Sequence, residues 1–129
     1  MVKNNNQIKI LLIEDDSFLL SMYTTRFELE NFKVLVAEDG EKGLKMAYKE
    51  CPDIILLDII LPKMNGFEVL STIKKDKALK DIPVILLTNL SQKDEIKKGL
   101  SLGAVDYLIK AHFMPSEVVE KILKIINKE

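Results

Sequence analysis

The sequence is short of two residue types on which many functional sites depend. It holds one cysteine, Cys51, and one histidine, His112, among 129 residues. A single cysteine excludes an internal disulfide and fits a reducing compartment, and we expect Cys51 to have no catalytic role. A single histidine excludes zinc motifs built on paired histidines and argues against a Ser-His-Asp triad. The chemistry of this chain therefore has to come from other side chains.

Long apolar runs and a large excess of charge of either sign are also missing. The start, MVKNNNQ, is polar and lacks the apolar stretch of a secretory signal, and no run approaches membrane-spanning length. We therefore expect a cytoplasmic protein. The net charge of −1 offers no basic face for nucleic acid or an anionic membrane, so we expect neither as a partner.

The chain has the length and composition of one globular domain. It is 47% hydrophobic and 30% charged, which is ordinary for a soluble domain, and 129 residues can bury a core without disulfides. We expect a disordered N-terminal tail over residues 1–6 and one domain over residues 7–129. No low-complexity tract or linker interrupts this domain.

Short apolar runs, rich in Ile, Val and Leu and mostly without polar alternation, are typical of strands covered on both faces. They occupy residues 8–13, 34–37, 54–57, 84–87 and 105–109. Segments with helical spacing follow them, marked by Leu20, Tyr23 and Phe27; Leu44, Ala47 and Tyr48; Phe67, Leu70 and Ile73; Ile96 and Leu100; and Val118, Ile122 and Ile125. Five repeats of strand and helix predict an α/β fold, a doubly wound parallel sheet with helices on both faces.

Capping residues agree with this alternation. Asp39-Gly40 marks a helix start, and Ser91 with Asp94 three residues on resembles a capping box. Gly103 stands where the fourth helix ends, and Pro115 suits the first turn of the fifth.

Polar side chains follow the predicted strands at the edge where doubly wound sheets place their sites. They are Glu14, Asp15 and Asp16 after the first strand, Asp58 after the third, Thr88 after the fourth and Lys110 after the fifth. Glu38 follows the second, but a strand at the edge of the sheet would keep it apart. Each group alone has a structural explanation, such as a helix cap for Asp16. Their coincidence at one edge favours a functional site.

These groups suit phosphoryl transfer. Packed carboxylates repel one another unless a cation lies among them, and Mg²⁺ prefers carboxylates together with water and phosphate oxygens. Asp58 can attack phosphorus to form an aspartyl phosphate. The Lys110 ammonium, the Thr88 hydroxyl and the metal would then neutralise the phosphoryl oxygens.

At these residues the chain resembles the receiver domain of bacterial two-component response regulators, over residues 7–128. The stretch ILLDIILPKMNG carries the pattern of that family's phosphorylation loop, and LLIEDD, LLTN and DYLIK carry its acidic pair, hydroxyl and lysine. The matching residues are Asp58, Leu61, Pro62, Met64, Asn65 and Gly66 in the loop, with Glu14, Asp15, Thr88 and Lys110 outside it.

The resemblance implies a five-stranded, flavodoxin-like sheet of strand order 2-1-3-4-5 and a phosphoacceptor role. Asp58 would accept a phosphoryl group from a sensor histidine kinase or a histidine phosphotransfer protein. The Mg²⁺ ligands would be Asp15, Asp58 and the backbone carbonyl of Ile60, with Glu14 acting through water. Two further groups, Thr88 and Lys110, would bind the phosphate.

The resemblance also implies how the signal leaves the domain. Tyr107 would be the switch aromatic that turns inward when the Thr88 hydroxyl moves onto the phosphate. The responsive surface would be the fourth helix, fifth strand and fifth helix, and it would bind a downstream effector protein. We expect a monomer or a weak dimer through that surface. Since only NKE follows the fifth helix, we expect a stand-alone signalling protein that catalyses only its own phosphorylation and dephosphorylation.

Two departures from the family pattern carry their own expectations. Ala111 follows Lys110 where the family usually has a proline in a cis peptide, and a non-proline cis bond costs about 3 kcal/mol, so the loop either stores that strain or takes a trans path. Ile60 and Leu90, two positions past Asp58 and Thr88, are both apolar. We expect a long-lived phosphoryl group, because neither side chain can orient an attacking water.

Other functions fit the sequence less well. An aspartate-nucleophile phosphatase usually has Asp-x-Asp, and Ile60 stands at the second position. A flavodoxin-like cofactor site would place phosphate against Glu14 and Asp15, and no Gly-x-Gly-x-x-Gly follows any strand. A receiver-like interaction module that does not use phosphorylation stays open. The broad apolar face of the last helix also leaves two interpretations, a well-buried helix or a docking and dimer face.

Overall fold

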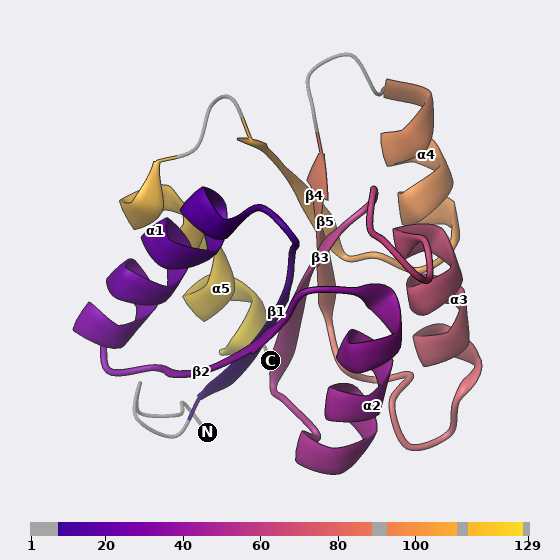
Figure 1. The fold of residues 1–129 in the computed structure, drawn as a ribbon, viewed down its shortest axis with the longest axis horizontal. Helices are drawn as coiled ribbons and strands as arrows, with labels where there is room; N and C mark the ends of the chain where they lie inside the picture. Colours follow the sequence, from indigo (N-terminus) through magenta and orange to yellow (C-terminus); the bar gives the residue numbers. More distant parts are fainter. Residues whose placement is uncertain (1–7, 89–92, 111–113, 128–129) are drawn as a thin grey trace.

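A computed structural model gives the structure of the chain and describes residues 8–88, 93–110 and 114–127. Within these residues one parallel sheet has the strand order β2-β1-β3-β4-β5, and helices cover both of its faces (Figure 1). The elements are β1 Lys9–Ile13, α1 Ser17–Leu29, β2 Lys33–Ala37, α2 Gly40–Glu50, β3 Ile54–Asp58, α3 Gly66–Lys75, β4 Val84–Thr88, α4 Lys93–Ser101, β5 Asp106–Ile109 and α5 Pro115–Ile126. The predicted doubly wound α/β fold and its strand order are confirmed.

The predicted tail at residues 1–6 and the predicted cap at Ser91 lie outside the described residues. None of the described helices has the length and hydrophobicity needed to cross a membrane.

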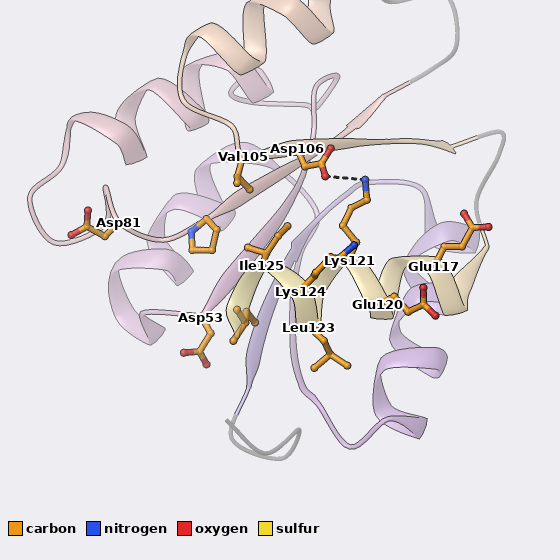
Figure 2. A pocket seen from close by; sticks show the side chains of 12 residues that line it. Asp53, Asp81, Val105, Asp106, Glu117, Glu120, Lys121, Leu123, Lys124 and Ile125 are labelled. Atoms are coloured by element: carbon orange, nitrogen blue, oxygen red, sulfur yellow. Dashed lines mark hydrogen bonds and ion pairs between the residues drawn. The ribbon is translucent and has the colours of Figure 1, made fainter. Parts of the chain in front are cut away.

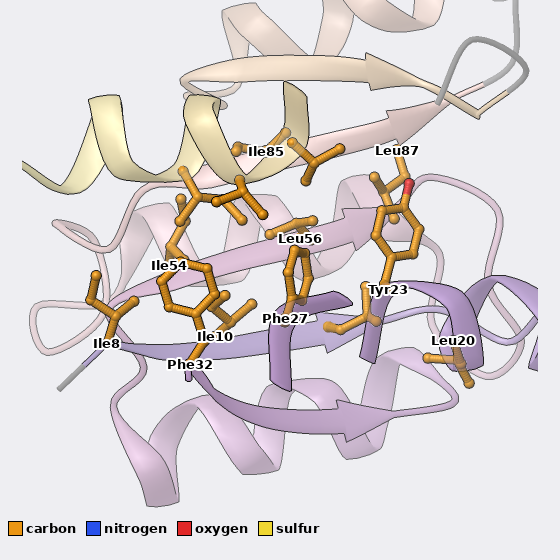
Figure 3. Packing of buried hydrophobic residues seen from close by; sticks show 14 residues of the cluster. Ile8, Ile10, Leu20, Tyr23, Phe27, Phe32, Ile54, Leu56, Ile85 and Leu87 are labelled. Atoms are coloured by element: carbon orange, nitrogen blue, oxygen red, sulfur yellow. The ribbon is translucent and has the colours of Figure 1, made fainter. Parts of the chain in front are cut away.

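Two apolar cores flank the sheet because neighbouring strand residues point to opposite faces. Ile10 and Leu12 of β1 pack on the side of α1 and α5, where Tyr23 and Phe27 of α1 are fully buried (Figure 3). Leu11 of β1 packs on the other side, against α2 and α3. The central strand β3 is buried along its whole length, which explains its uninterrupted apolar sequence.

Helix caps fix where several helices begin and end. The Asp16 carboxylate accepts hydrogen bonds from the amides of Phe18 and Leu19, at 2.9 and 3.1 Å, and so caps α1 as predicted. Asp39 caps α2 in the same way, through the amide of Lys42 at 2.8 Å. Gly103 follows α4 with φ of 113°, a left-handed value that suits a helix end.

Two side chains of the predicted helical faces, Tyr48 and Leu100, are more exposed than expected, and Leu100 is 42% exposed at the end of α4. Tyr48 of α2 is 47% exposed, and its hydroxyl donates a hydrogen bond of 2.8 Å to Asp76 beyond α3. Its assignment to the apolar face of the helix was wrong, because a tyrosine at the border of that face can keep its hydroxyl in solvent and bind a partner there.

The broad apolar face of α5 is largely explained by packing. Val118, Val119 and Ile122 are buried against the core that contains α1. Ile125 and Ile126 are partly buried and touch the same core. The interpretation as a well-buried helix therefore accounts for most of this face.

Candidate functional site

The strand order places the polar strand ends next to one another. β1 and β3 are neighbours, with Ile13 level with Leu57, so Glu14 and Asp15 leave β1 beside Asp58 at the end of β3. β4 and β5 follow on the same side, and Thr88 at the end of β4 is level with Ile109. β2 lies on the other side of β1, at the edge of the sheet, and Glu38 after it is exposed. The chain adds β2 on one side of β1 and β3 on the other, so the direction in which strands are added reverses between β1 and β3, next to this site.

Asp58 is buried at the end of β3 and held by two donors. Its side chain is 5% exposed. The Lys110 ammonium donates a hydrogen bond of 2.7 Å to Oδ2, and the backbone amide of Ile60 donates one of 3.2 Å to Oδ1. A charged hydrogen bond of this length is strong, and it fixes the Asp58 carboxylate in one orientation.

The loop after β3 closes tightly over Asp58. The Gly66 amide donates to the Ile59 carbonyl at 2.9 Å, and Asn65 caps α3 through the amide of Phe67. A Cβ on Gly66 would lie only 2.3 Å from the Asp58 carbonyl oxygen. Glycine is therefore required where α3 begins, because any side chain would push the helix away from the site.

Glu14 is the most deeply buried carboxylate of the site, at 0% exposure. Its Oε2 accepts a hydrogen bond of 3.0 Å from the backbone amide of Asp16. Its Oε1 lies 3.1 Å from the Lys110 ammonium in an ion pair whose geometry is not that of a hydrogen bond. This buried oxygen therefore has an ion-pair contact with Lys110 but no hydrogen-bond donor among the described residues, which is an energetic cost that a divalent cation at the site would offset.

The site shifts the pKa of both Glu14 and Lys110. Burial, with the nearby Asp58 charge, raises the pKa of the Glu14 carboxyl from 4.5 to about 7, against the opposing effects of the Asp16 amide and Lys110. Burial alone would lower the pKa of the Lys110 ammonium, but the hydrogen bond to Asp58 and the charges of Asp58 and Glu14 outweigh it and raise that pKa. The site thus favours the charged form of Lys110 and holds a proton on Glu14 more tightly than an ordinary carboxyl group does.

Three carboxylates of the site could hold a metal ion. One oxygen each from Glu14, Asp15 and Asp58 lie within 4.8 Å of one another. Asp15 is exposed, and the other two are buried. They line a cavity of about 330 Å³ together with Asp16, Ile60 and Lys110. Hard oxygen donors and a buried Glu14 oxygen without a donor fit a divalent ion such as Mg²⁺, since its charge would offset the repulsion between the carboxylates.

The remaining predicted residues with a described structure, Thr88 and Tyr107, lie on β4 and β5 and are not among the residues that line this cavity. Thr88 is 1% exposed at the end of β4, and Tyr107 is half-buried on β5, level with Leu86. Leu90 and Ala111 lie outside the described residues, so the expectations attached to them, including the isomer of the peptide after Lys110, stay predictions.

Sequence reasoning missed one residue beneath the site. Tyr23 of α1 was assigned only to the core, but burial, together with the charges of Glu14 and Asp58, raises the pKa of its hydroxyl above the ordinary range. Its hydroxyl end points toward Leu87 of β4 (Figure 3). The sequence indicates only that Tyr23 lies on the buried face of the first helix, and this does not show how close it is to Glu14 and Asp58.

A doubly wound sheet with acidic side chains at its switch point belongs to the flavodoxin-like class of α/β domains. Within that class, the model of the response regulator receiver domain matches residues 10–123. The chain belongs to this family.

Curated relatives are longer than this chain. The probable transcriptional regulator ycf27 of Guillardia theta is 35% identical over 120 residues, which cover 93% of this chain and 46% of that protein. The alkaline phosphatase synthesis transcriptional regulatory protein PhoP of Bacillus subtilis is also 35% identical, over 93% of this chain and 49% of its own length. The chain spans about half the length of these curated relatives. The absence of a nucleic-acid partner therefore stays a prediction for this chain.

Solved structures agree with the fold over almost the whole chain. A putative response regulator from Chloroflexus aurantiacus superposes with a TM-score of 0.88 at 27% identity, covering 94% of this chain and 98% of that one. The receiver domain of the sensor histidine kinase PA1611 from Pseudomonas aeruginosa has a TM-score of 0.82 at 26% identity, covering 92% and 95%. That structure has a magnesium ion coordinated in its active-site cleft.

Proposed function

We propose that this chain is a phosphoacceptor of a two-component phosphorelay, in which Asp58 takes a phosphoryl group from a phosphohistidine. The observation that carries the proposal is the contact of the Lys110 ammonium with Asp58 at 2.7 Å, beside the carboxylates of Glu14 and Asp15. The phosphohistidine would belong to a sensor histidine kinase or a histidine phosphotransfer protein. The chain would catalyse only its own phosphorylation and dephosphorylation, in the cytoplasm.

The proposed transfer is an in-line displacement at phosphorus. An Asp58 carboxylate oxygen forms the new O–P bond as the P–N bond to the histidine breaks, and the imidazole nitrogen takes back its electron pair. Asp58 is already fixed by Lys110 and the Ile60 amide, so little reorganisation precedes attack. The Lys110 ammonium would then exchange the Asp58 oxygen for a phosphoryl oxygen.

Magnesium would complete the neutralisation of charge. Asp15, Asp58 and the Ile60 carbonyl would hold the ion, with Glu14 acting through water, and the bound ion would neutralise charge that develops on the phosphoryl oxygens. Ile60 lines the same cavity as the three carboxylates. Loss of the Glu14 proton would accompany metal binding, because a nearby cation lowers the pKa of a carboxyl group.

The proposed output is a change of the surface formed by α4, β5 and α5. Thr88 ends β4 at the site and is level with Ile109 of β5, the strand that carries Tyr107. Movement of the Thr88 hydroxyl onto the phosphoryl group would let Tyr107 turn inward. The altered surface would bind a downstream effector, with the chain a monomer or a weak dimer.

Incubation with Mg²⁺ and acetyl phosphate, followed by intact mass measurement, tests the proposal. The wild type should gain the mass of one phosphoryl group, and Asp58→Asn should gain none. Lys110→Ala should accumulate far less product than the wild type, because the ammonium no longer neutralises the phosphoryl oxygens. A wild type that gains no mass would favour the second candidate, an interaction module that does not use phosphorylation. The Ala111 that follows Lys110 in place of the family's usual proline is the observation that favours that candidate.

A further inference from the structure

Tyr23 of α1 carries a buried hydroxyl group in the core beneath the proposed phosphorylation site. The side chain is fully buried, its hydroxyl oxygen included. It belongs to the same apolar core as Leu12 and Leu56, and its hydroxyl end points toward Leu87 of β4 (Figure 3). An apolar side chain would fill a core position of this kind without the cost of burying a hydroxyl group. The hydroxyl group therefore needs an explanation beyond packing.

The sheet directs Asp58 to the same side as Tyr23. Alternate residues of a strand point to one face of the sheet, and residues that are level on neighbouring strands share that face. Leu56 and Leu87 both belong to the core that contains α1. Asp58 follows Leu56 by two residues and is level with Leu87, so it continues this face at the end of β3. The Tyr23 hydroxyl thus points toward the direct neighbour of Asp58 (Figure 3).

Glu14 continues the same face on the next strand. It follows Leu12, a residue of the same core, by two positions. Its amide donates a hydrogen bond of 3.0 Å to the carbonyl of Ala37, so the extended backbone of β1 continues through it. The register of β1 against β3 brings Glu14 beside Asp58. Glu14, Asp58 and Leu87 therefore form a row across three neighbouring strands, on the side of α1.

The electrostatics agree with this placement. Burial, and then the charges of Glu14 and Asp58, raise the pKa of the Tyr23 hydroxyl above the ordinary range. The hydroxyl group therefore keeps its proton and can donate it in a hydrogen bond. On the other side, Oε1 of Glu14 is buried and accepts no hydrogen bond from the described residues, because its contact with Lys110 is an ion pair. A donor and an acceptor thus lie on the same buried face of the sheet.

We propose that Tyr23 is a positioning residue of the metal site, whose hydroxyl donates a hydrogen bond to Glu14, directly or through one bound water. This bond would hold the Glu14 carboxylate in the orientation in which it acts on the water of the metal ion. Groups that orient the ligands of a metal in this way commonly change its affinity by about tenfold or more. The inference rests on the proposed function, because Tyr23 would act only through Glu14.

Titration of Mg²⁺ into the wild type and Tyr23→Phe tests this inference, with the backbone amide shifts of Asp15 and Asp58 as the readout. The variant keeps the aromatic ring and loses only the hydroxyl group, so the fold should persist. We expect it to bind Mg²⁺ about five- to tenfold more weakly than the wild type. Equal affinity of the two proteins would overturn the inference, and so would a wild type that binds no Mg²⁺.

Phosphorylation rates separate positioning from a general loss of structure. With acetyl phosphate as the donor and limiting Mg²⁺, Tyr23→Phe should react more slowly than the wild type by the same factor as its loss of affinity, because fewer molecules hold the ion. At saturating Mg²⁺ the two rates should agree within about twofold. A distorted site would instead react slowly at both Mg²⁺ concentrations, and that result would contradict the role of Tyr23.

Two control variants account for packing and for loss of a hydroxyl group elsewhere. Phe32→Leu changes a buried ring at the other end of the same core (Figure 3), and it should lower stability without weakening Mg²⁺ binding. Tyr48→Phe removes an exposed hydroxyl group that binds Asp76, and it should change neither the affinity nor the rate. Equal losses of affinity in Phe32→Leu and Tyr23→Phe would overturn the inference, because packing alone would then explain both.

The role of Tyr23 and the proposed function fail on different results. A wild type that gains no phosphoryl mass overturns the proposed function, and the Mg²⁺ titration still decides whether Tyr23 positions Glu14. Equal Mg²⁺ affinity of the wild type and Tyr23→Phe overturns the role of Tyr23 and leaves the phosphorylation of Asp58 unaffected.

Discussion

Folding changes the charge state of the Glu14 carboxyl in the range between acid and neutral pH. Burial raises its pKa from 4.5 to about 7, so the folded chain holds a proton there more tightly than the unfolded chain. This proton contributes fully to the free energy of unfolding below pH 4.5, the pKa of the carboxyl in the unfolded chain. The contribution is lost as the pH rises from 4.5 to about 7, the pKa in the folded chain.

Glu14→Gln should remove this pH dependence. In buffer without divalent ions we expect the variant to exceed the wild type in free energy of unfolding by about 2–3 kcal/mol near pH 8, and to match it near pH 4. Urea denaturation at both pH values measures the difference. Glu28→Gln, an exposed change of the same kind on α1, should shift neither value. Parallel pH profiles of the wild type and Glu14→Gln would contradict this assignment.

A second prediction at the scale of single residues concerns how the side chain of Ile60 affects the lifetime of the aspartyl phosphate. It lines the cavity at Asp58 and is 61% exposed, yet it offers no group that could orient water. We expect a long-lived aspartyl phosphate in the wild type and hydrolysis about tenfold faster in Ile60→Glu, because a carboxylate there can position or deprotonate water.

Loss of phosphate over time, measured by intact mass after removal of acetyl phosphate, tests this expectation. Phe18→Gln changes a similarly exposed apolar side chain, 72% exposed, that is not among the cavity's lining residues. Its phosphate should decay at the wild-type rate. Rapid loss from the wild type with no phosphatase present would show that the apolar side chain does not protect the phosphate.

At the scale of elements, the start of α3 determines how Asp58 is held. Gly66→Ala places a Cβ within 2.3 Å of the Asp58 carbonyl oxygen and 2.7 Å of the Ile59 Cα. Both neighbours are backbone atoms, so α3 or the end of β3 has to move. We expect a loss of about 2–4 kcal/mol in free energy of unfolding, together with slower phosphorylation.

Lys75→Ala on the same helix is the matched control for Gly66→Ala. Lys75 is exposed in the last turn of α3, so its removal should change stability by about 0.5 kcal/mol or less. Thermal and urea unfolding of both variants measure the difference. Equal stability of Gly66→Ala and the wild type would mean that the loop relaxes without cost.

At the scale of the whole molecule, repulsion between the carboxylates of the site lowers the free energy of unfolding. Two buried carboxylates and one exposed carboxylate face a single ammonium at the end of the sheet. A divalent ion that binds only the folded chain should therefore stabilise all of it. We expect millimolar Mg²⁺ to raise the Tm of the wild type by about 2–6 °C. The same addition should raise the Tm of Asp15→Asn by much less, because one proposed ligand of the ion is lost. Scanning calorimetry with and without Mg²⁺ measures it, and an equal rise in Asp15→Asn would place the ion elsewhere.

Much of the fold followed from the sequence because parallel strands buried on both faces need continuous apolar runs. The strand ends then brought Glu14, Asp15, Asp58 and Lys110 to one edge, as the strand-to-helix alternation predicted. The sequence did not show that Tyr48 would be exposed, since the border of a helical face depends on how the helix is rotated against the sheet.

By itself the sequence determined the order of strands and helices and which polar side chains leave the strands at the site. Only the tertiary structure decided that Lys110 lies 2.7 Å from Asp58 and 3.1 Å from Glu14, and that burial raises the Glu14 pKa to about 7. It also placed Asp53, Asp81 and Glu117, which are far apart in the chain, around one groove (Figure 2). The physical reason is that periodicity is local, whereas electrostatic energies and cavities depend on distances between elements that only packing brings together.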